Sequence, residues 1–288
     1  MTCLRHALCS SKQVLKKHGI EDSDTEARAI LQFVTGLSAA ELYAQPERRL
    51  TDEEQKQLEQ LLKRRLSREP LAYLTNKKEF YGLEFYVNRH VLIPRPETEL
   101  LVETAIALAN RATDGTYAPI IADVGTGCGA IAISLAVNLP ACRFYATDIS
   151  PHALDVARTN AERHNVRHRI TFLEGNLLQP LPEPVDIIVA NLPYVSYAEL
   201  RKLPPEIRNF EPEIALNGGK NGLELIGQLM LQVESKIKPA GHLLLEIGQG
   251  HGEKLASLVR SSLRSAELSF LADLNGVKRV ARISFPER

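Results

Sequence analysis

Asp123-Val124-Gly125-Thr126-Gly127-Cys128-Gly129-Ala130 is the stretch that decides the fold of this 288-residue chain. It joins a buried-strand pattern, residues 120–124, to an apolar helix pattern, residues 130–137, through a turn rich in glycine. Glycine permits the tight turn and lets a ligand approach the backbone closely, and the start of the helix offers unpaired N–H groups. The stretch therefore predicts a ligand site at the carboxyl end of this strand.

Strand and helix patterns alternate from this stretch to near the end of the chain. Ser150 caps one of the helices, with Pro151 in the favoured first position. Short apolar runs predict five strands, at residues 120–124, 143–147, 170–173, 185–190 and 242–247. Such alternation predicts an α/β fold with a mostly parallel sheet that helices cover on both faces.

The chain before residue 94 shows different patterns. Thr51 and Glu54 match a capping box that precedes a leucine stripe, and residues 1–78 predict a small helical bundle. Residues 79–93 are rich in aromatic and β-branched side chains, which predicts a linking β-hairpin with its turn at residues 88–90. The α/β domain is then expected to occupy residues 94–288.

Composition and charge restrict the class of protein. The 35 basic and 35 acidic residues balance, which argues against a protein held to nucleic acid mainly by phosphate contacts. The four cysteines show neither CxxC pairing nor metal spacing, which favours free thiols in a reducing compartment and no metal site. No apolar run approaches the roughly 18 residues of a membrane helix, and residues 1–10 lack the core of a secretory signal. We expect a cytoplasmic enzyme.

Asp148 follows the second predicted strand and lies 23 residues after Gly125. A carboxylate at this position can accept hydrogen bonds from ribose hydroxyls, so the loop and Asp148 together predict a cofactor that contains a nucleoside. Gly125, Gly127 and Ala130 also satisfy the dinucleotide fingerprint, so a dinucleotide remains an alternative. The further glycine, Gly129, shortens the loop in a way that suits S-adenosylmethionine, which has no pyrophosphate.

The tetrapeptide Asn191-Leu192-Pro193-Tyr194 follows the predicted strand at residues 185–190 and indicates the chemistry. The side-chain oxygen of Asn191 and a nearby backbone carbonyl can accept both hydrogens of a planar NH₂ group, and Tyr194 can pack against its plane. With a methyl donor opposite, this motif predicts a methyltransferase that acts on an amino group.

Several segments together resemble the PrmC/HemK family of protein glutamine N5-methyltransferases over nearly the whole chain. The specific part is the Ile-Pro-Arg-Pro-Glu-Thr-Glu segment, residues 93–99, beside the Asn-x-Pro-Tyr motif. The matching segments are residues 91–103, 123–134, 147–150 with 153–154, 191–194, 211–216 with 218–219 and 222–223, and 246–249. The family's tetrapeptide is Asn-Pro-Pro-Tyr; here Leu192 replaces the first proline and keeps its backbone carbonyl. Asn-Leu-Pro-Tyr is also similar to the motif of ribosomal-RNA adenine dimethyltransferases.

The resemblance implies a Rossmann-like, S-adenosylmethionine-dependent methyltransferase that releases S-adenosylhomocysteine and uses no metal. It implies three groups of site residues. Those that bind the cofactor are Gly125, Thr126, Gly127, Cys128, Gly129, Asp148, Asn176, Leu177 and Asn191. Those that hold the substrate are Asn191, Leu192, Pro193 and Tyr194. Those in the active-site wall are Arg95, Pro96, Glu97 and Thr98.

The implied substrate is the glutamine of the Gly-Gly-Gln motif in class-1 peptide chain release factors. The helical region would dock the rest of that partner, and no stable binding to nucleic acid is expected. One alternative is an adenine-N6 methyltransferase that acts on rRNA or DNA, because adenine also presents a planar NH₂ group that this motif can hold. The residue patterns are also compatible with a nicotinamide dehydrogenase, or with a non-catalytic module that keeps only the cofactor fold.

Overall fold

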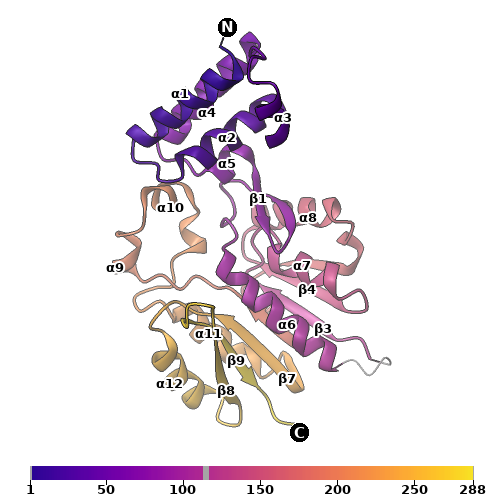
Figure 1. Ribbon diagram of the computed structural model, residues 1–288. Coiled ribbons are helices and arrows are strands. Elements are labelled where there is room, and N and C mark those ends of the chain that lie inside the picture. Colours follow the sequence, from indigo (N-terminus) through magenta and orange to yellow (C-terminus); the bar gives the residue numbers. More distant parts are fainter. Residues whose placement is uncertain (1, 113–116, 288) are drawn as a thin grey trace. The chain divides into compact units, whose positions relative to one another are not determined.

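A computed structural model describes residues 2–112 and 117–287, and in it the chain divides into two compact units. The first unit comprises Met1–Lys77 and Pro204–Phe210, and the second comprises Lys78–Leu203 and Glu211–Arg288. The short segment 204–210 thus belongs with the N-terminal helices, although its neighbours in sequence belong to the second unit. Figure 1 labels most of the helices and several of the strands.

The first unit is helical, as the sequence predicts. Its helices are α1 (Leu4–Lys17), α2 (Ser23–Thr35), α3 (Ala39–Ala44), α4 (Asp52–Leu66), α5 (Leu71–Thr75) and α10 (Pro205–Phe210). The predicted capping box of Thr51 and Glu54 is present at the start of α4, and Ser38 and Glu41 form a second one at α3. The apolar stripes of α1, α2 and α4 meet in one core that includes Leu58.

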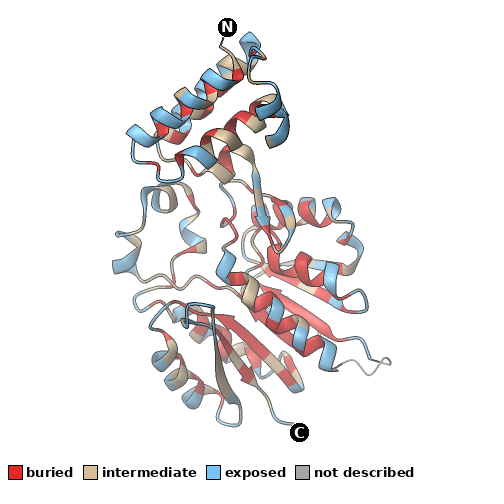
Figure 2. Ribbon diagram, viewed as in Figure 1, coloured by how far each residue is buried: buried red, intermediate tan, exposed pale blue. Residues whose placement is uncertain are grey.

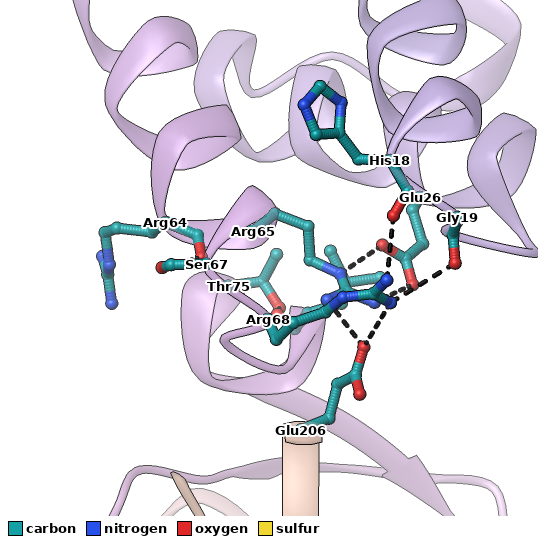
Figure 3. A network of polar contacts seen from close by, with 10 residues as sticks. His18, Gly19, Glu26, Arg64, Arg65, Ser67, Arg68, Thr75 and Glu206 are labelled. Carbon is teal, nitrogen blue, oxygen red and sulfur yellow. Dashed lines mark hydrogen bonds and ion pairs between the residues drawn. The ribbon is translucent and has the colours of Figure 1, made fainter. Parts of the chain in front are cut away.

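A buried arginine explains why α10 belongs to this unit. Arg65 of α4 donates to both carboxylate oxygens of Glu26, at 2.6 and 3.1 Å, and it is only 5% exposed. Arg65 also donates to Glu206 of α10 at 3.3 Å, and Arg68 donates to the same Glu206 oxygen at 3.1 Å (Figure 3). Paired guanidinium–carboxylate bonds have a fixed geometry, so this network determines where residues 204–210 attach to the helical unit.

The hairpin that follows the helices differs from the predicted one. Its strands are β1 (Lys77–Phe80) and β2 (Leu83–Tyr86). The turn lies at Tyr81 and Gly82, which both have positive φ, as a two-residue hairpin turn favours. The prediction of a turn at residues 88–90 and a strand at 91–93 is wrong, because the Val91 N–H bonds to the Asn88 carbonyl in a local turn. Residues 91–93 are apolar because they are packed into the unit, and they pair with no strand.

The second unit is built on a seven-stranded sheet of order β5-β4-β3-β6-β7-β9-β8. The strands are β3 (Ile120–Val124), β4 (Arg143–Asp148), β5 (Ile170–Glu174), β6 (Val185–Ala190), β7 (Ile237–Glu246), β8 (Glu267–Ala272) and β9 (Lys278–Ser284). Strands β3 to β7 pair in parallel, while β8 and β9 are antiparallel. The predicted mostly parallel sheet and its five strands are confirmed. The prediction lacks β8 and β9, because β8 is only half-buried and shows no apolar run.

Helices cover both faces of this sheet. They are α6 (Glu99–Ala112), α7 (Ala130–Asn138), α8 (Pro151–Arg163), α11 (Glu224–Val233) and α12 (Gly252–Ser262), with the short helices α9 (Tyr197–Leu200), η1 (Pro96–Thr98), η2 (Arg167–Arg169) and η3 (Glu213–Ala215). Helices α11 and α12 share an apolar core with alternate residues of the strands, such as Ile120 and Val124. Helix α6 contacts β6, β7 and β9. Strand β3 is buried along its whole length, as a strand covered on both faces must be (Figure 2).

All four cysteines lie among the described residues and are free thiols, of which Cys128 and Cys142 are buried. Over the same residues, no helix combines the length and hydropathy that a membrane span requires. Nor does this part of the chain hold a group of three or more His, Cys, Asp or Glu side chains placed to bind a metal ion.

Candidate functional site

The carboxyl ends of the central strands define the candidate site. In the sheet order, β4 and β5 lie on one side of β3 and the later strands β6 and β7 lie on the other. The strand order therefore reverses between β3 and β6, and open α/β sheets bind their ligands at the carboxyl edge beside such a point. A cavity of about 300 Å³ lies at this edge.

Half of the predicted site residues line this cavity, and half do not. The predicted residues in its lining are Gly125, Gly127, Asp148, Asn176, Leu177, Asn191, Leu192 and Pro193. The predicted residues outside its lining are Thr126, Cys128, Gly129, Tyr194, Arg95, Pro96, Glu97 and Thr98. In the second set, Thr98 is bonded to Asn191 of the first set.

The glycine loop is bound to the neighbouring strand through its backbone. The N–H groups of Gly125 and Thr126 both donate to the carbonyl of Thr147, each at 2.9 Å. Gly125 and Gly127 have φ of +73° and +56°, the left-handed region in which a side chain is strained. Both glycines border the cavity, so the loop presents bare backbone to it.

Gly129 serves the packing of the helix rather than the cavity. Its φ is +83°, and a Cβ there would lie 2.8 Å from Cδ1 of Ile133 and 3.2 Å from Cβ of Ala157. The carbonyl of the preceding residue, Cys128, accepts a hydrogen bond from the Asn160 amide at 2.9 Å. Burial raises the pKa of the Cys128 thiol to about 12, so this thiol is protonated at neutral pH. The second half of the loop therefore fixes the start of α7.

Asp123 anchors the loop from the strand that precedes it. Its Oδ2 accepts hydrogen bonds from the Thr126 hydroxyl at 2.6 Å and from the Ala132 N–H at 3.1 Å. Burial raises the pKa of this carboxyl to about 7, although both hydrogen bonds act to lower it. Thr126 thus turns toward the interior, and its role is to hold the turn.

Asp148 ends β4 and borders the cavity. Its two oxygens accept hydrogen bonds from the N–H groups of Gly127 and Ser150, each at 2.9 Å. Burial raises the pKa of this carboxyl, and the backbone hydrogen bonds oppose the rise. Each oxygen keeps a lone pair, so Asp148 can still accept a hydrogen bond from a ligand.

Asn176 and Leu177 reach the cavity from the segment after β5. The Thr147 hydroxyl donates to the carbonyl of Leu177 at 2.9 Å, which ties this segment to β4. Leu177 is only 8% exposed, and its φ is +55°. A buried hydrogen bond therefore holds its apolar side chain in the lining.

The tetrapeptide follows β6 and spreads over two environments. Asn191, Leu192 and Pro193 line the cavity. The Asn191 amide donates from Nδ2 to the Thr98 hydroxyl at 3.1 Å. The Tyr194 hydroxyl donates to Oε1 of Glu246 at 3.2 Å, and burial together with that carboxylate raises the pKa of Tyr194. Tyr194 therefore lies outside the lining and is bonded to the end of β7.

The predicted wall residues support the lining from outside it. Arg95 forms an ion pair with Glu211, whose other oxygen accepts a hydrogen bond from the Ile93 N–H at 3.3 Å. Residues 96–98 form the short helix η1, and Thr98 reaches the site through its bond to Asn191. Thr98 is thereby hydrogen-bonded to a residue of the lining.

The cavity lining also includes residues that the sequence patterns did not indicate. They are His90, Val91, Leu92, Thr147, Ile149, Ser150, Ala153, Gly175, Ile214, Ala215 and Leu225. Ile149 could have been found from the sequence, because it is an apolar residue that directly follows Asp148. Ile214 and Ala215 carry no such signal, because their approach to the cavity depends on the path of the chain after β6.

Two family models match the chain. Residues 6–75 match the PrmC N-terminal domain, and residues 103–210 match the ribosomal protein L11 methyltransferase (PrmA). The first match lies within the helical unit, and the second includes the glycine loop and the tetrapeptide.

Curated relatives match over nearly the whole chain. The release factor glutamine methyltransferase of Bradyrhizobium diazoefficiens is 36% identical over 92% of this chain and 89% of its own length. That of Moorella thermoacetica is 40% identical over 90% of both chains. The bifunctional methyltransferase of Rickettsia typhi is 38% identical, and this chain spans about half of it, 52%.

Solved structures share the fold of the second unit at low identity. A methyltransferase from Pyrococcus furiosus is 18% identical, with a TM-score of 0.54 over 73% of this chain and 92% of that one. The N-terminal domain of human METTL16, solved in complex with SAH, is 18% identical, with a TM-score of 0.51 over 72% of this chain and 77% of that one. These likenesses establish a Rossmann-like methyltransferase fold. Since full-length relatives match at 36–40% identity, the chain belongs to the family of release factor glutamine methyltransferases.

Proposed function

We propose that the protein transfers a methyl group from S-adenosylmethionine to the side-chain amide nitrogen, N5, of the glutamine in the Gly-Gly-Gln motif of class-1 peptide chain release factors. The main support for this proposal is that the predicted substrate-binding and cofactor-binding residues line one cavity. Asn191 and Leu192 line the same space as Gly125 and Asp148. In this proposal, the amino-group acceptor site and the nucleoside site lie at the same edge of the sheet.

The residues around the cavity suit S-adenosylmethionine. The backbone at Gly125 and Gly127 is bare, the side chains of Ile149 and Leu177 are apolar, and Asp148 keeps acceptor capacity. An adenine ring requires apolar side chains on its faces, and a ribose requires a hydrogen-bond acceptor. When bound, S-adenosylmethionine supplies an electrophilic methyl group on a sulfonium sulfur.

The residues of this chain would hold the amide nitrogen of the substrate glutamine in position. The nitrogen of a glutamine side chain is a poor nucleophile, because its lone pair is delocalised into the carbonyl. Asn191 through Oδ1 and Leu192 through its carbonyl would accept the two N–H bonds and fix the direction of the nitrogen. Positive charge grows on the nitrogen as it reacts, and two fixed acceptor dipoles stabilise that charge. The proton then leaves an acidic nitrogen, so no dedicated base is needed.

A protein substrate is favoured over adenine by the helical unit and by the family. The relatives that match over both units include release factor glutamine methyltransferases. We propose that the helical unit docks the release factor, that nucleic acid is not stably bound, and that the enzyme acts in the cytoplasm. Adenine-N6 methylation of rRNA or DNA remains the second candidate, because Asn191-Leu192-Pro193-Tyr194 can hold that amino group too.

Transfer of labelled methyl groups tests the proposal. The protein is incubated with methyl-labelled S-adenosylmethionine and either release factor or ribosomal RNA. We expect label at the Gly-Gly-Gln glutamine of the release factor. Label in RNA and none in release factor would overturn the choice of substrate.

Two variants then test the roles in the site. Asn191→Ala should lower kcat by about 10²–10³, because it removes one fixed acceptor, while the Kd for S-adenosylhomocysteine by calorimetry changes little. Asp148→Ala should instead weaken that Kd. Asn138→Ala is the matched control, because Asn138 is exposed at the end of α7 and its amide donates to the Ser134 carbonyl of the same helix at 2.8 Å. Near-normal turnover of Asn191→Ala would refute the amide-clamp mechanism.

A further inference from the structure

Two segments that lie far apart in the sequence contribute to the lining of the cavity without belonging to the sheet. One comprises residues 90–92, and the other comprises residues 214–215 of η3. Neither segment is part of a strand, so strand pairing does not hold it at the cavity. Contacts between side chains and backbone must therefore fix this part of the wall.

Glu211 joins these two segments. Its side chain is 1% exposed, and it lies two residues before η3. Oε1 of Glu211 accepts a hydrogen bond from the guanidinium of Arg95, and Oε2 accepts one from the N–H of Ile93 at 3.3 Å. Ile93 directly follows residues 90–92. One enclosed carboxyl group thus ties the chain that leaves the first segment to the chain that enters the second.

The chain after η3 is fixed to the residue that follows the tetrapeptide. The N–H of Val195 donates to the carbonyl of Leu216 at 3.0 Å, and the carbonyl of Val195 accepts from the N–H of Gly218 at 2.9 Å. A Cβ at Gly218 would lie 2.7 Å from the carbonyl oxygen of Pro193, so the two backbones approach as closely as glycine allows. Residues 211–218 therefore form a strap that is attached at both ends.

Different kinds of contact hold the two ends of the strap. Backbone hydrogen bonds hold the end at Gly218, whereas the end at Glu211 is held through its side chain. Burial raises the pKa of Glu211, and Arg95 and the Ile93 N–H oppose that rise. Without Arg95 the enclosed carboxyl would keep one of these two donors, and a buried charge that loses its partner is strongly unfavourable. We therefore expect loss of Arg95 to displace this end of the strap.

We propose that Arg95 and Glu211 are positioning residues of the cofactor site, which hold the strap so that Ile214 and Ala215 complete the wall of the cavity. The inference rests on the proposed function in one respect, that this cavity binds S-adenosylmethionine. Neither Arg95 nor Glu211 lines the cavity, so both act through the residues that they hold in place. Ile214 lines the cavity and is 59% exposed although it is apolar, so it offers apolar surface to a ligand.

A double-mutant cycle separates this role from that of an ion pair which only stabilises the fold. Arg95→Met and Glu211→Leu each remove one partner, and the double variant replaces the pair with two apolar side chains. Arg95→Lys is the mildest change and takes the place of Arg95→Met if that variant does not fold. Arg48→Met is the matched control, because Arg48 forms an ion pair with Glu54 at 2.7 Å in the helical unit and its side chain is 31% exposed, as is that of Arg95.

The first readout is the Kd for S-adenosylhomocysteine, measured by calorimetry at a temperature at which thermal unfolding shows every variant to be folded. We expect each single variant to raise this Kd by about tenfold, as when the complete wall is populated about one-tenth of the time. The double variant should also stay near tenfold rather than about 100-fold, because both substitutions release the same end of the strap. Arg48→Met should keep the Kd of the wild type. Single variants with the wild-type Kd, or a double variant in which the two effects multiply, would overturn the inference.

A second readout needs neither ligand nor activity. The N–H groups of residues 215–217 bond to the carbonyls of residues 212 and 213, each at 2.9 Å. Their exchange with solvent should be faster in Arg95→Met than in the wild type and unchanged in Arg48→Met. If the wild type binds no S-adenosylhomocysteine, the proposed function fails, while this exchange pattern still decides whether the ion pair holds the strap. Equal exchange in all three proteins would refute the role of the pair.

Discussion

The charge of Asp123 should make the stability of the second unit depend on pH. The carboxyl is enclosed at the end of β3, where it holds Thr126 and the start of α7. Its second oxygen, Oδ1, is buried and has no partner within the part of the chain that the structure describes. Asp123→Asn nearly preserves the shape, keeps an acceptor for the Thr126 hydroxyl and does not titrate.

The sign and size of this pH dependence follow from the pKa of Asp123 in the unfolded and in the folded state. In the unfolded chain Asp123 loses its proton near its ordinary pKa of 3.8, whereas burial raises the pKa in the folded protein to about 7. Between these values the folded state binds more protons, so the contribution of Asp123 to stability falls as the pH rises. About 3 pH units at about 1.4 kcal/mol each give at most about 4 kcal/mol. The unpaired amide NH₂ of the variant adds a cost that does not change with pH.

Native-state hydrogen exchange of β3 and α7 amides reports the free energy of opening for this unit without requiring a two-state transition of the whole chain. Measured from about pH 4 to about pH 8, the stability of the wild type minus that of Asp123→Asn should decline by up to about 4 kcal/mol. Other titrating groups cancel in this difference. A difference that stays constant over the range would refute the reasoning, because Asp123 would then have a similar pKa in both states.

Three further predictions concern single side chains. Gly129→Ala should destabilise the second unit by about 1–3 kcal/mol in thermal or chemical unfolding, because a Cβ would lie 2.8 Å from Ile133 at a φ of +83°. Arg65→Ala should destabilise the helical unit by about 3–5 kcal/mol, since Glu26 and Glu206 lose a buried partner. The control Arg64→Ala, at an exposed ion pair, should destabilise it by less than about 1 kcal/mol. Equal losses of stability in the two variants would contradict the buried-pair argument. Leu192→Pro keeps the backbone carbonyl, so its kcat should stay within a few-fold of the wild-type value. Loss of the buried leucine should lower the free energy of unfolding by about 2 kcal/mol. A large fall in kcat would show that the carbonyl is displaced.

The sequence by itself determined the parts of this protein that depend on local pattern. The glycine loop, the capping box at Thr51 and the five parallel strands follow from residue periodicity and turn chemistry, and the structure confirms them. The matching segments identified the family for the same reason, because motifs such as Asn191-Leu192-Pro193-Tyr194 are contiguous. Errors arose where local pattern is ambiguous, as at residues 88–93, where an apolar run that packs into the unit looks like a strand.

Tertiary structure alone decided which distant residues meet. Residues 204–210 join the helical unit because Glu206 finds a buried guanidinium on Arg65, and no local pattern encodes that pairing. The Asn191 amide bonds to the Thr98 hydroxyl although the two residues are 93 positions apart in the sequence, so only the fold brings them together. The sequence predicts an asparagine where an amino group can bind. The fold determines which side chains surround that asparagine, because residues distant in the sequence become neighbours only when the strands and helices pack together.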